Sequence, residues 1–130
     1  MIAGDLASSG TRQIYCNRDT AGLCGPQSGV IAYAIIVTSG GNIVGSDIFT
    51  CDSFFNNYRP TAQAICPSSV DNLPWSQGGI MLHELSHATA GTTDVAYGCN
   101  TNRNLQHNDK FRNADNYQCL ALHNFRLHNC

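Results

Sequence analysis

The distribution of apolar and polar positions predicts strands in the first part of the chain and helices in the second. Val30 to Val37 is rich in β-branched and aromatic residues, and a Ser-Gly-Gly turn signal follows it at positions 39–41. Asn42 to Thr50 shows a weaker, interrupted strand pattern on the far side of that turn. Together the two segments predict neighbouring strands of a small sheet.

The clearest helical pattern begins after Pro74, since proline is tolerated at a helix start but not in its interior. Ser76 suits the N-cap position, and Gly91 is expected to end the helix and let the chain turn back. Two stripes follow the helical period. The stripe expected to face a cleft consists of Ile80, His83, Glu84 and His87, and the stripe expected to pack into the core consists of Met81, Leu82 and Leu85.

Weaker patterns predict a short helix over Arg59 to Ile65, which Pro67 follows, and a last helix over Asn113 to Leu127. One face of that last helix carries Ala114, Tyr117, Ala121 and Phe125. The asparagine-rich stretch Asn100 to Asn108 is expected to be a loop. The architecture predicted from these elements is α+β.

Length and composition narrow the classes of protein that fit. A chain of 130 residues, 42% of them hydrophobic, can build one modest core, which predicts a single domain over residues 1–130 with residues 1–14 as an extension. Only 12% of residues are charged, the net charge is −2 and there is no polybasic stretch, so no nucleic-acid partner is expected. The longest apolar run is far too short for a membrane span. Seven cysteines indicate disulfides and an oxidising, extracellular setting.

Residues 83–87 read HELSH, which places two histidines four positions apart with a glutamate directly after the first. On a helix, positions i and i+4 lie on one face, so His83 and His87 can both reach one metal ion, with Glu84 beside them. Asp94 follows seven residues after His87, behind a glycine turn, as a third ligand would. Two buried core histidines are the alternative, but the spacing and the intervening glutamate favour a metal site for one zinc ion.

The stretch Gly91 to Gly98 reads GTTDVAYG, and together with HELSH it resembles the aspzincin (deuterolysin) family of secreted zinc metalloendopeptidases. Further matching segments occur in the family's order: Tyr15-Cys16-Asn17, Ala32-Tyr33, Cys51-Asp52, Asn113 to Tyr117, and a cysteine near the end, Cys130. The resemblance implies a zincin-like fold with a small antiparallel-type sheet, an active-site helix and a C-terminal helix. It also implies that His83, His87 and Asp94 bind zinc, that Glu84 is catalytic and that Tyr97 assists at the transition state.

The resemblance also bears on the cysteines and on the N-terminus. It implies the disulfides Cys24–Cys51 and Cys66–Cys130, which leaves Cys99 and Cys119 as an expected third pair and Cys16 unpaired. The family's N-terminal helical portion, which supplies the partner of that cysteine, has no counterpart in the residues before Tyr15. We therefore expect a fragment or a truncated chain.

Two further features have open interpretations. Asp115 could orient a zinc-binding histidine, or it could contact a basic substrate side chain, as the matching aspartate does in related peptidyl-lysine endopeptidases, or it could simply begin a helix. In those enzymes an acidic residue follows three positions later, where this chain has Gln118, so strict lysine selectivity is not expected. In zincin-like folds an edge strand binds the substrate backbone; Ile43 to Phe49 is either that strand or an ordinary sheet strand.

The leading hypothesis is a secreted, monomeric zinc endopeptidase that cleaves extended protein or peptide substrates, with Glu84 as the general base. The alternative is a disulfide-stapled, secreted zinc-binding or effector domain that has lost turnover together with its N-terminal portion. The intact Glu84 and Tyr97 favour the enzyme.

Overall fold

The computed structural model describes residues 12–130, which divide into two compact units. One unit contains residues 12–57 and Glu84–Gly91, and the other contains Tyr58–His83 and Thr92–Cys130. Helix α4 (Gln77–Ala90) begins in the second unit and ends in the first. Among the described residues, no helix combines the length and the apolar character that crossing a membrane requires. The α+β class expected from the sequence is confirmed.

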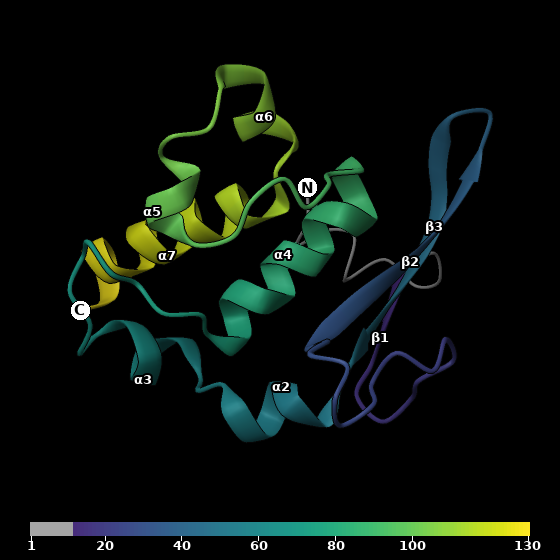
Figure 1. Cartoon of the computed structure of the whole chain (residues 1–130), viewed down its shortest axis with the longest axis horizontal. Coiled ribbons are helices and arrows are strands. Elements are labelled where there is room, and N and C mark those ends of the chain that lie inside the picture. The colour runs from purple at the N-terminus through teal and green to yellow at the C-terminus, as the bar shows by residue number, and fades with distance from the viewer. Residues whose placement is uncertain (1–11) are drawn as a thin grey trace. The chain divides into compact units, whose positions relative to one another are not determined.

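The first unit is built on a three-stranded sheet of β1 (Arg12–Tyr15), β2 (Ala32–Ser39) and β3 (Asn42–Thr50), in the order β1-β3-β2 (Figure 1). Strands β2 and β3 form an antiparallel hairpin whose turn contains Gly40 and Gly41, both at positive φ, the conformation that a tight hairpin turn requires. Both strands predicted from the sequence are confirmed. Strand β1 pairs with β3 in parallel, so the sheet is mixed rather than purely antiparallel.

Strand β3 is the central strand of this sheet. Its residues Ser46 to Phe49 pair with β1 on one side and with β2 on the other. A substrate strand could not join the sheet at these residues, because both of their ladder edges are already used. The interpretation of Ile43 to Phe49 as an edge strand is therefore wrong for its second half, which is an ordinary sheet strand.

Three aromatic rings, one from each strand, stack side by side across the sheet. The ring of Phe49 stacks on Tyr15 of β1 at 5.1 Å and on Tyr33 of β2 at 4.9 Å between centroids. The Tyr33 hydroxyl donates to Asp19 Oδ1 at 2.8 Å, and the same carboxylate accepts the backbone N–H groups of Leu23 and Cys24. These hydrogen bonds, that of Cys24 foremost, hold the pKa of Asp19 below its ordinary value of 3.8. The loop before β2 is thereby tied to the sheet.

A disulfide between Cys24 and Cys51 closes the same region, and the short helix α2 (Asp52–Asn57) follows it directly. Cys16, just after β1, is exposed and carries a free thiol. The Arg12 guanidinium donates from Nε to the backbone carbonyl of Ala88 at 3.4 Å, which ties β1 to the last turns of α4.

Helix α4 has the bounds that its sequence predicts. The hydroxyl of Ser76 accepts the backbone N–H of Gly79 at 3.2 Å, which is the hydrogen bond of an N-cap. At the other end Gly91 has a φ of 63°, a left-handed conformation that favours glycine after a helix. Both signals acted locally, which is why the helix could be predicted from the sequence.

The division of α4 into a cleft-facing and a core-facing stripe holds only in part: Leu85 is buried and His87 is partly exposed, as expected, but other positions differ. Ile80, His83 and Glu84, expected to face a cleft, are all buried, whereas Met81 and Leu82 are only partly buried. The reason lies in the neighbours of the helix: the rings of Trp75 and Tyr97 both pack against the His83 ring, at 6.0 Å between centroids. The periodicity of one helix does not reveal rings that come from other segments.

The second unit contains, besides the start of α4, the helices α3 (Thr61–Ile65), α5 (Cys99–Asn102), α6 (His107–Arg112) and α7 (Ala114–Asn129). Its apolar core is formed by Ala64, Ile65, Leu73 and Leu122, with Phe125 packed against them. Figure 1 shows α5 lying along α7, and the disulfide Cys99–Cys119 joins these two helices. A further disulfide, Cys66–Cys130, fixes the end of α7 to the segment after α3.

The stretch 100–108, expected to be a loop, contains most of α5 and the start of α6. A tertiary contact explains the helix α5 in this stretch: Asn102 is buried, and its side chain donates to Asp115 of α7. Asparagine is a weak helix former in isolation, so composition alone favours a loop here.

Candidate metal centre

His83, His87 and Asp94 form a group whose ligand atoms all lie within 4.8 Å of one another. The two histidines lie one helical turn apart on α4, and Asp94 follows three residues after the glycine that ends the helix. Nε2 of His83 lies 3.0 Å from Oδ1 of Asp94. Bonds of about 2.0–2.2 Å in tetrahedral geometry separate two zinc ligands by about 3.3 Å, so a zinc ion fits between these atoms with little adjustment. Two imidazoles and one carboxylate are also the donor set of catalytic zinc sites, which keep a position open.

The loop that carries Asp94 is held on both sides by the start of α7. Thr93 forms a β-bridge with Asn113: the N–H of Thr93 donates to the carbonyl of Arg112 at 2.7 Å, and the N–H of Ala114 donates to the carbonyl of Thr93 at 3.0 Å. On the other side of Asp94, the side-chain oxygen of Asn113 accepts the N–H groups of residues 95 and 96 at 3.0 and 3.2 Å. Asp94 thus sits on a short segment whose backbone is fixed directly before and after it.

Asp115 is fully buried, with 0% of its surface exposed, and its carboxylate is surrounded by donors. Oδ2 accepts the N–H of Gly98 at 2.6 Å and the side-chain amide of Asn102 at 2.7 Å, and Oδ1 accepts the amide of Gln118. Burial raises the pKa of this carboxyl, but the facing His83 ring and these hydrogen bonds outweigh burial and bring its pKa below the ordinary value of 3.8. Asp115 is therefore a buried anion at neutral pH.

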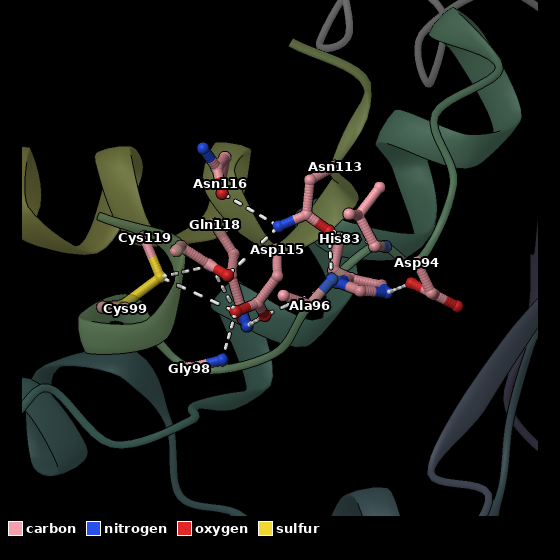
Figure 2. Close-up of polar contacts among 12 residues, drawn as sticks. His83, Asp94, Ala96, Gly98, Cys99, Asn113, Asp115, Asn116, Gln118 and Cys119 are labelled. Atoms are coloured by element: carbon pink, nitrogen blue, oxygen red, sulfur yellow. Dashed lines mark hydrogen bonds and ion pairs between the residues drawn. A yellow bond between two sulfur atoms is a disulfide. The ribbon is translucent and has the colours of Figure 1, made fainter. Parts of the chain in front are cut away.

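The His83 ring lies between two carboxylates, as Figure 2 shows: Asp94 faces one ring nitrogen and Asp115 the other. Nδ1 is 3.7 Å from Oδ1 of Asp115, longer than a direct hydrogen bond but close enough for the anion to favour a proton on Nδ1. In neutral imidazole a proton on Nδ1 leaves the lone pair on Nε2. That tautomer presents its lone pair toward Asp94, where a metal would bind.

The two predicted catalytic side chains differ in exposure. Glu84 directly follows His83 on α4 and is 7% exposed, whereas Tyr97 is 52% exposed and stacks on the His83 ring at 6.0 Å with an angle of 19° between planes. The side chain of Asp94 is 42% exposed. Solvent therefore reaches the Asp94 side of His83 and the Tyr97 ring, while the Asp115 side is sealed.

Gln118, predicted to accompany Asp115, is also buried, and its amide points at the Asp115 carboxylate. It packs closely against α4: a Cβ added to Gly79 would lie 2.8 Å from its side-chain oxygen. Asp115 and Gln118 thus lie in the interior beside His83. The remaining histidines, His107, His123 and His128, do not belong to the metal-ligating group.

Sequence reasoning missed two contributors. Trp75 lies 6.0 Å from the His83 ring and 5.8 Å from the Tyr97 ring, and Tyr58 lies 6.5 Å from Trp75. Asn102 links the Asp115 carboxylate to Asn113 through the two ends of its amide. The position of Trp75, directly before the N-cap of the helix that carries His83 and His87, was the only signal in the sequence for its contact with His83.

Comparison with known proteins identifies a family. A family model described as lysine-specific metallo-endopeptidase, of the aspzincin group, matches residues 2–121. A search of curated proteins finds no match.

Proposed function

Because the chain belongs to the aspzincin family of zinc metallo-endopeptidases, we propose that it hydrolyses peptide bonds of extended protein or peptide substrates with one zinc ion per chain. The observation that carries the proposal is the convergence of His83, His87 and Asp94 within 4.8 Å, with a glutamate next to the first histidine. Zinc, when bound there, would supply polarisation of the scissile carbonyl and activation of a water molecule.

We propose that Glu84 is the general base. It is the only glutamate in the chain, and its place after His83 puts it on the helix that carries both imidazoles. In this role the carboxylate takes a proton from the attacking water and then delivers it to the nitrogen of the leaving amine.

Tyr97 and Asp115 have supporting roles in the proposal. The Tyr97 hydroxyl donates a hydrogen bond to the oxygen on which negative charge develops, a contribution of about 3 kcal/mol in comparable sites. The stacking of its ring on His83 supports this role by keeping the side chain beside the ligand. Asp115 holds the proton of His83 on Nδ1 and thereby keeps Nε2 available to the metal. Its complete burial favours this orienting role over contact with a substrate.

We also propose that the protein is secreted and acts outside the cell as a monomer. The three disulfides support secretion, because such bonds persist in oxidising compartments and are reduced in the cytosol.

Replacement of Glu84 by Gln tests the proposal. Casein hydrolysis by the wild-type protein should be lost on chelation and restored by zinc, and Glu84→Gln should lose nearly all turnover while it still binds one zinc per chain. The matched control is Asp71→Asn, the same acid-to-amide change at a highly exposed residue, which should leave turnover unchanged. Wild-type turnover in Glu84→Gln would reject the mechanism. Zinc binding without hydrolysis by the wild type would instead favour the non-catalytic zinc-binding domain.

A further inference from the structure

Helices α6 and α7 form a groove in the second unit, and none of its lining residues belongs to the metal-ligating group. The groove has a volume of about 390 Å³, within the range typical of small-molecule sites. A smaller hollow of about 200 Å³ shares Lys110, Asn116 and Leu120 with it. We call the larger one the α6–α7 groove; it is lined by His107, Lys110, Phe111, Asn116, Tyr117 and Leu120.

The walls of the α6–α7 groove are largely apolar and are held in place by their neighbours. Phe111 is 64% exposed and Leu120 is 73% exposed, although both are large apolar side chains. The Tyr117 hydroxyl donates to the backbone carbonyl of Phe111 at 2.8 Å, and the His107 ring packs edge-on against the Phe111 ring at 4.8 Å between centroids. The groove is therefore formed before anything binds, and a ligand that covers these side chains removes apolar surface from water.

Lys110 is the cationic residue of the α6–α7 groove, and it also lines the smaller hollow. It is the only lysine in the chain and is partly buried. Within residues 12–130 its ammonium group has no ion-pair or hydrogen-bond partner, and the adjacent Asp109 pairs with Arg112 at 3.6 Å instead. Partial removal of an ammonium group from water costs free energy when it has no partner, and an anion bound in the groove offsets that cost.

The surroundings of Lys110 add positive charge and hydrogen-bond donors. The smaller hollow contributes Arg103 and His123, and among the described residues no aspartate or glutamate lines either hollow, although the whole chain has a net charge of −2. Arg103 lies 3.8 Å from Asp71, but both side chains are largely exposed, so this pair is weak. The side-chain oxygen of Asn116 already accepts a hydrogen bond, which leaves its NH₂ group as a further donor. An apolar groove bordered in this way fits a ligand that is apolar at one end and anionic at the other.

We propose that the α6–α7 groove binds a small aromatic carboxylate, with its ring against Phe111, Tyr117 and Leu120 and its carboxylate on Lys110. Aromatic rings with centroids about 4.5–7 Å apart attract each other beyond the burial of apolar area, so the aromatic side chains favour an aromatic ligand over an aliphatic one. The charge of Lys110 favours the carboxylate over a neutral compound of the same shape. This binding site does not depend on the proposed peptidase activity.

Two dyes with the same ring system test the proposal on the zinc-loaded full chain. Anilinonaphthalene sulfonate carries an anionic group that stands in for the carboxylate, phenylnaphthylamine is neutral, and both emit more strongly in an apolar site. Lys110→Gln should weaken binding of the sulfonate dye about tenfold and change binding of the neutral dye less than about twofold. The matched control is Arg59→Gln, a loss of an exposed cation outside the groove, which should affect neither dye. Unchanged binding of the sulfonate dye to Lys110→Gln, or equal weakening of both dyes, would overturn the proposal.

Two exposed leucines of α7 test the apolar part of the groove. Leu120→Ala should weaken binding of both dyes about fivefold, whereas Leu127→Ala should weaken neither, although Leu127 is 77% exposed and lies on the same helix. Equal effects of the two changes, or no effect of either, would show that the dyes bind exposed apolar surface in general and would overturn the proposal.

Acetylation of Lys110 gives a readout that does not depend on dyes. Because Lys110 is the only lysine, its reaction with acetic anhydride can be followed by mass spectrometry of a digest, with the α-amino group as the internal reference. Naphthoate at about ten times its dissociation constant should slow the acetylation of Lys110 about tenfold and leave the reference unchanged, because only unoccupied Lys110 reacts. Propionate and naphthalenemethanol, which lack the ring and the charge respectively, should protect little at the same concentration. No protection by naphthoate, or equal protection by either control compound, would overturn the proposal.

Discussion

Replacement of Asp115 by Asn should weaken zinc binding without any change in a metal ligand. The amide oxygen can still accept from Gly98 and Asn102, as Oδ2 does, but the NH₂ group takes the place of Oδ1, which faces Gln118 and His83. A donor opposite Nδ1 favours the imidazole tautomer with its proton on Nε2, the atom that faces Asp94. Binding of the metal then requires that tautomer to be reversed.

The magnitude follows from the contacts. Loss of an orienting partner of a metal-bound histidine costs about 10–100-fold in metal affinity, which is about 1.4–2.7 kcal/mol. In the metal-free protein, the hydrogen bonds from Gly98 and Asn102 would go to a neutral amide oxygen in place of a charged carboxylate, a loss of about 1 kcal/mol each. The new NH₂ group would also face the donating amide of Gln118. The relief of burying a neutral group offsets part of this, so we expect a net loss of about 2 kcal/mol in the free energy of unfolding.

The assay measures zinc affinity by competition with a chromogenic chelator, and stability of the metal-free protein by urea denaturation. Asp109→Asn is the control, because Asp109 forms only a partly exposed ion pair with Arg112 and should change neither quantity measurably. Asn102→Ala removes one donor to Asp115 and the acceptor of the Asn113 amide, but it does not alter the group that faces His83, so it should cost stability with a smaller effect on zinc. Unchanged zinc affinity in Asp115→Asn would refute the orienting role.

Three further predictions concern single positions. Tyr97→Phe should lower kcat about 10²–10³-fold at unchanged zinc content; a wild-type kcat would remove Tyr97 from the mechanism. Gly91→Ala places a side chain at a φ of 63° and should cost about 1–3 kcal/mol in urea denaturation, whereas Gly25→Ala, in open space at ordinary φ, should cost little. The pKa of Asp19 is lower in the folded state than in the unfolded state, so its stabilisation is present above the unfolded pKa and is lost as pH falls through the folded pKa. Asp19→Asn should therefore lower the thermal midpoint at pH 7 but not in acid; a difference that persists at pH of about 2 would contradict this.

The parts of the fold and site that the sequence predicted are those encoded locally. The Ser76 cap, the Gly91 stop and the spacing of His83 and His87 all act within a few residues, so the helix and the candidate metal ligands on it could be identified without tertiary information. The hairpin turn at Gly40 is a signal of the same kind.

The features that the sequence could not predict depend on segments distant in the chain. The parallel pairing of β1 makes β3 a central strand, but no residue pattern within β3 indicates that pairing. Trp75 reaches Tyr97 only in the folded chain, and Asn102 becomes part of a helix because its amide meets Asp115. Ile80 and His83 lie on the side of α4 that was expected to face a cleft. They are buried because segments distant in the chain pack against them.

The parallel strand β1 also has a consequence for the order of synthesis and folding. Strands β2 and β3 pair through a short turn, and hairpins of this kind form in about 1–10 μs. Arg12 of β1 pairs with Ser46, which is 34 positions later, so at about 5–20 residues per second a ribosome makes the first strand several seconds before its partner. During that interval β1 has no strand to join, and its backbone can pair with another nascent chain. We therefore expect the yield of folded protein to rise when few chains are translated at the same time and to fall when many chains are translated side by side.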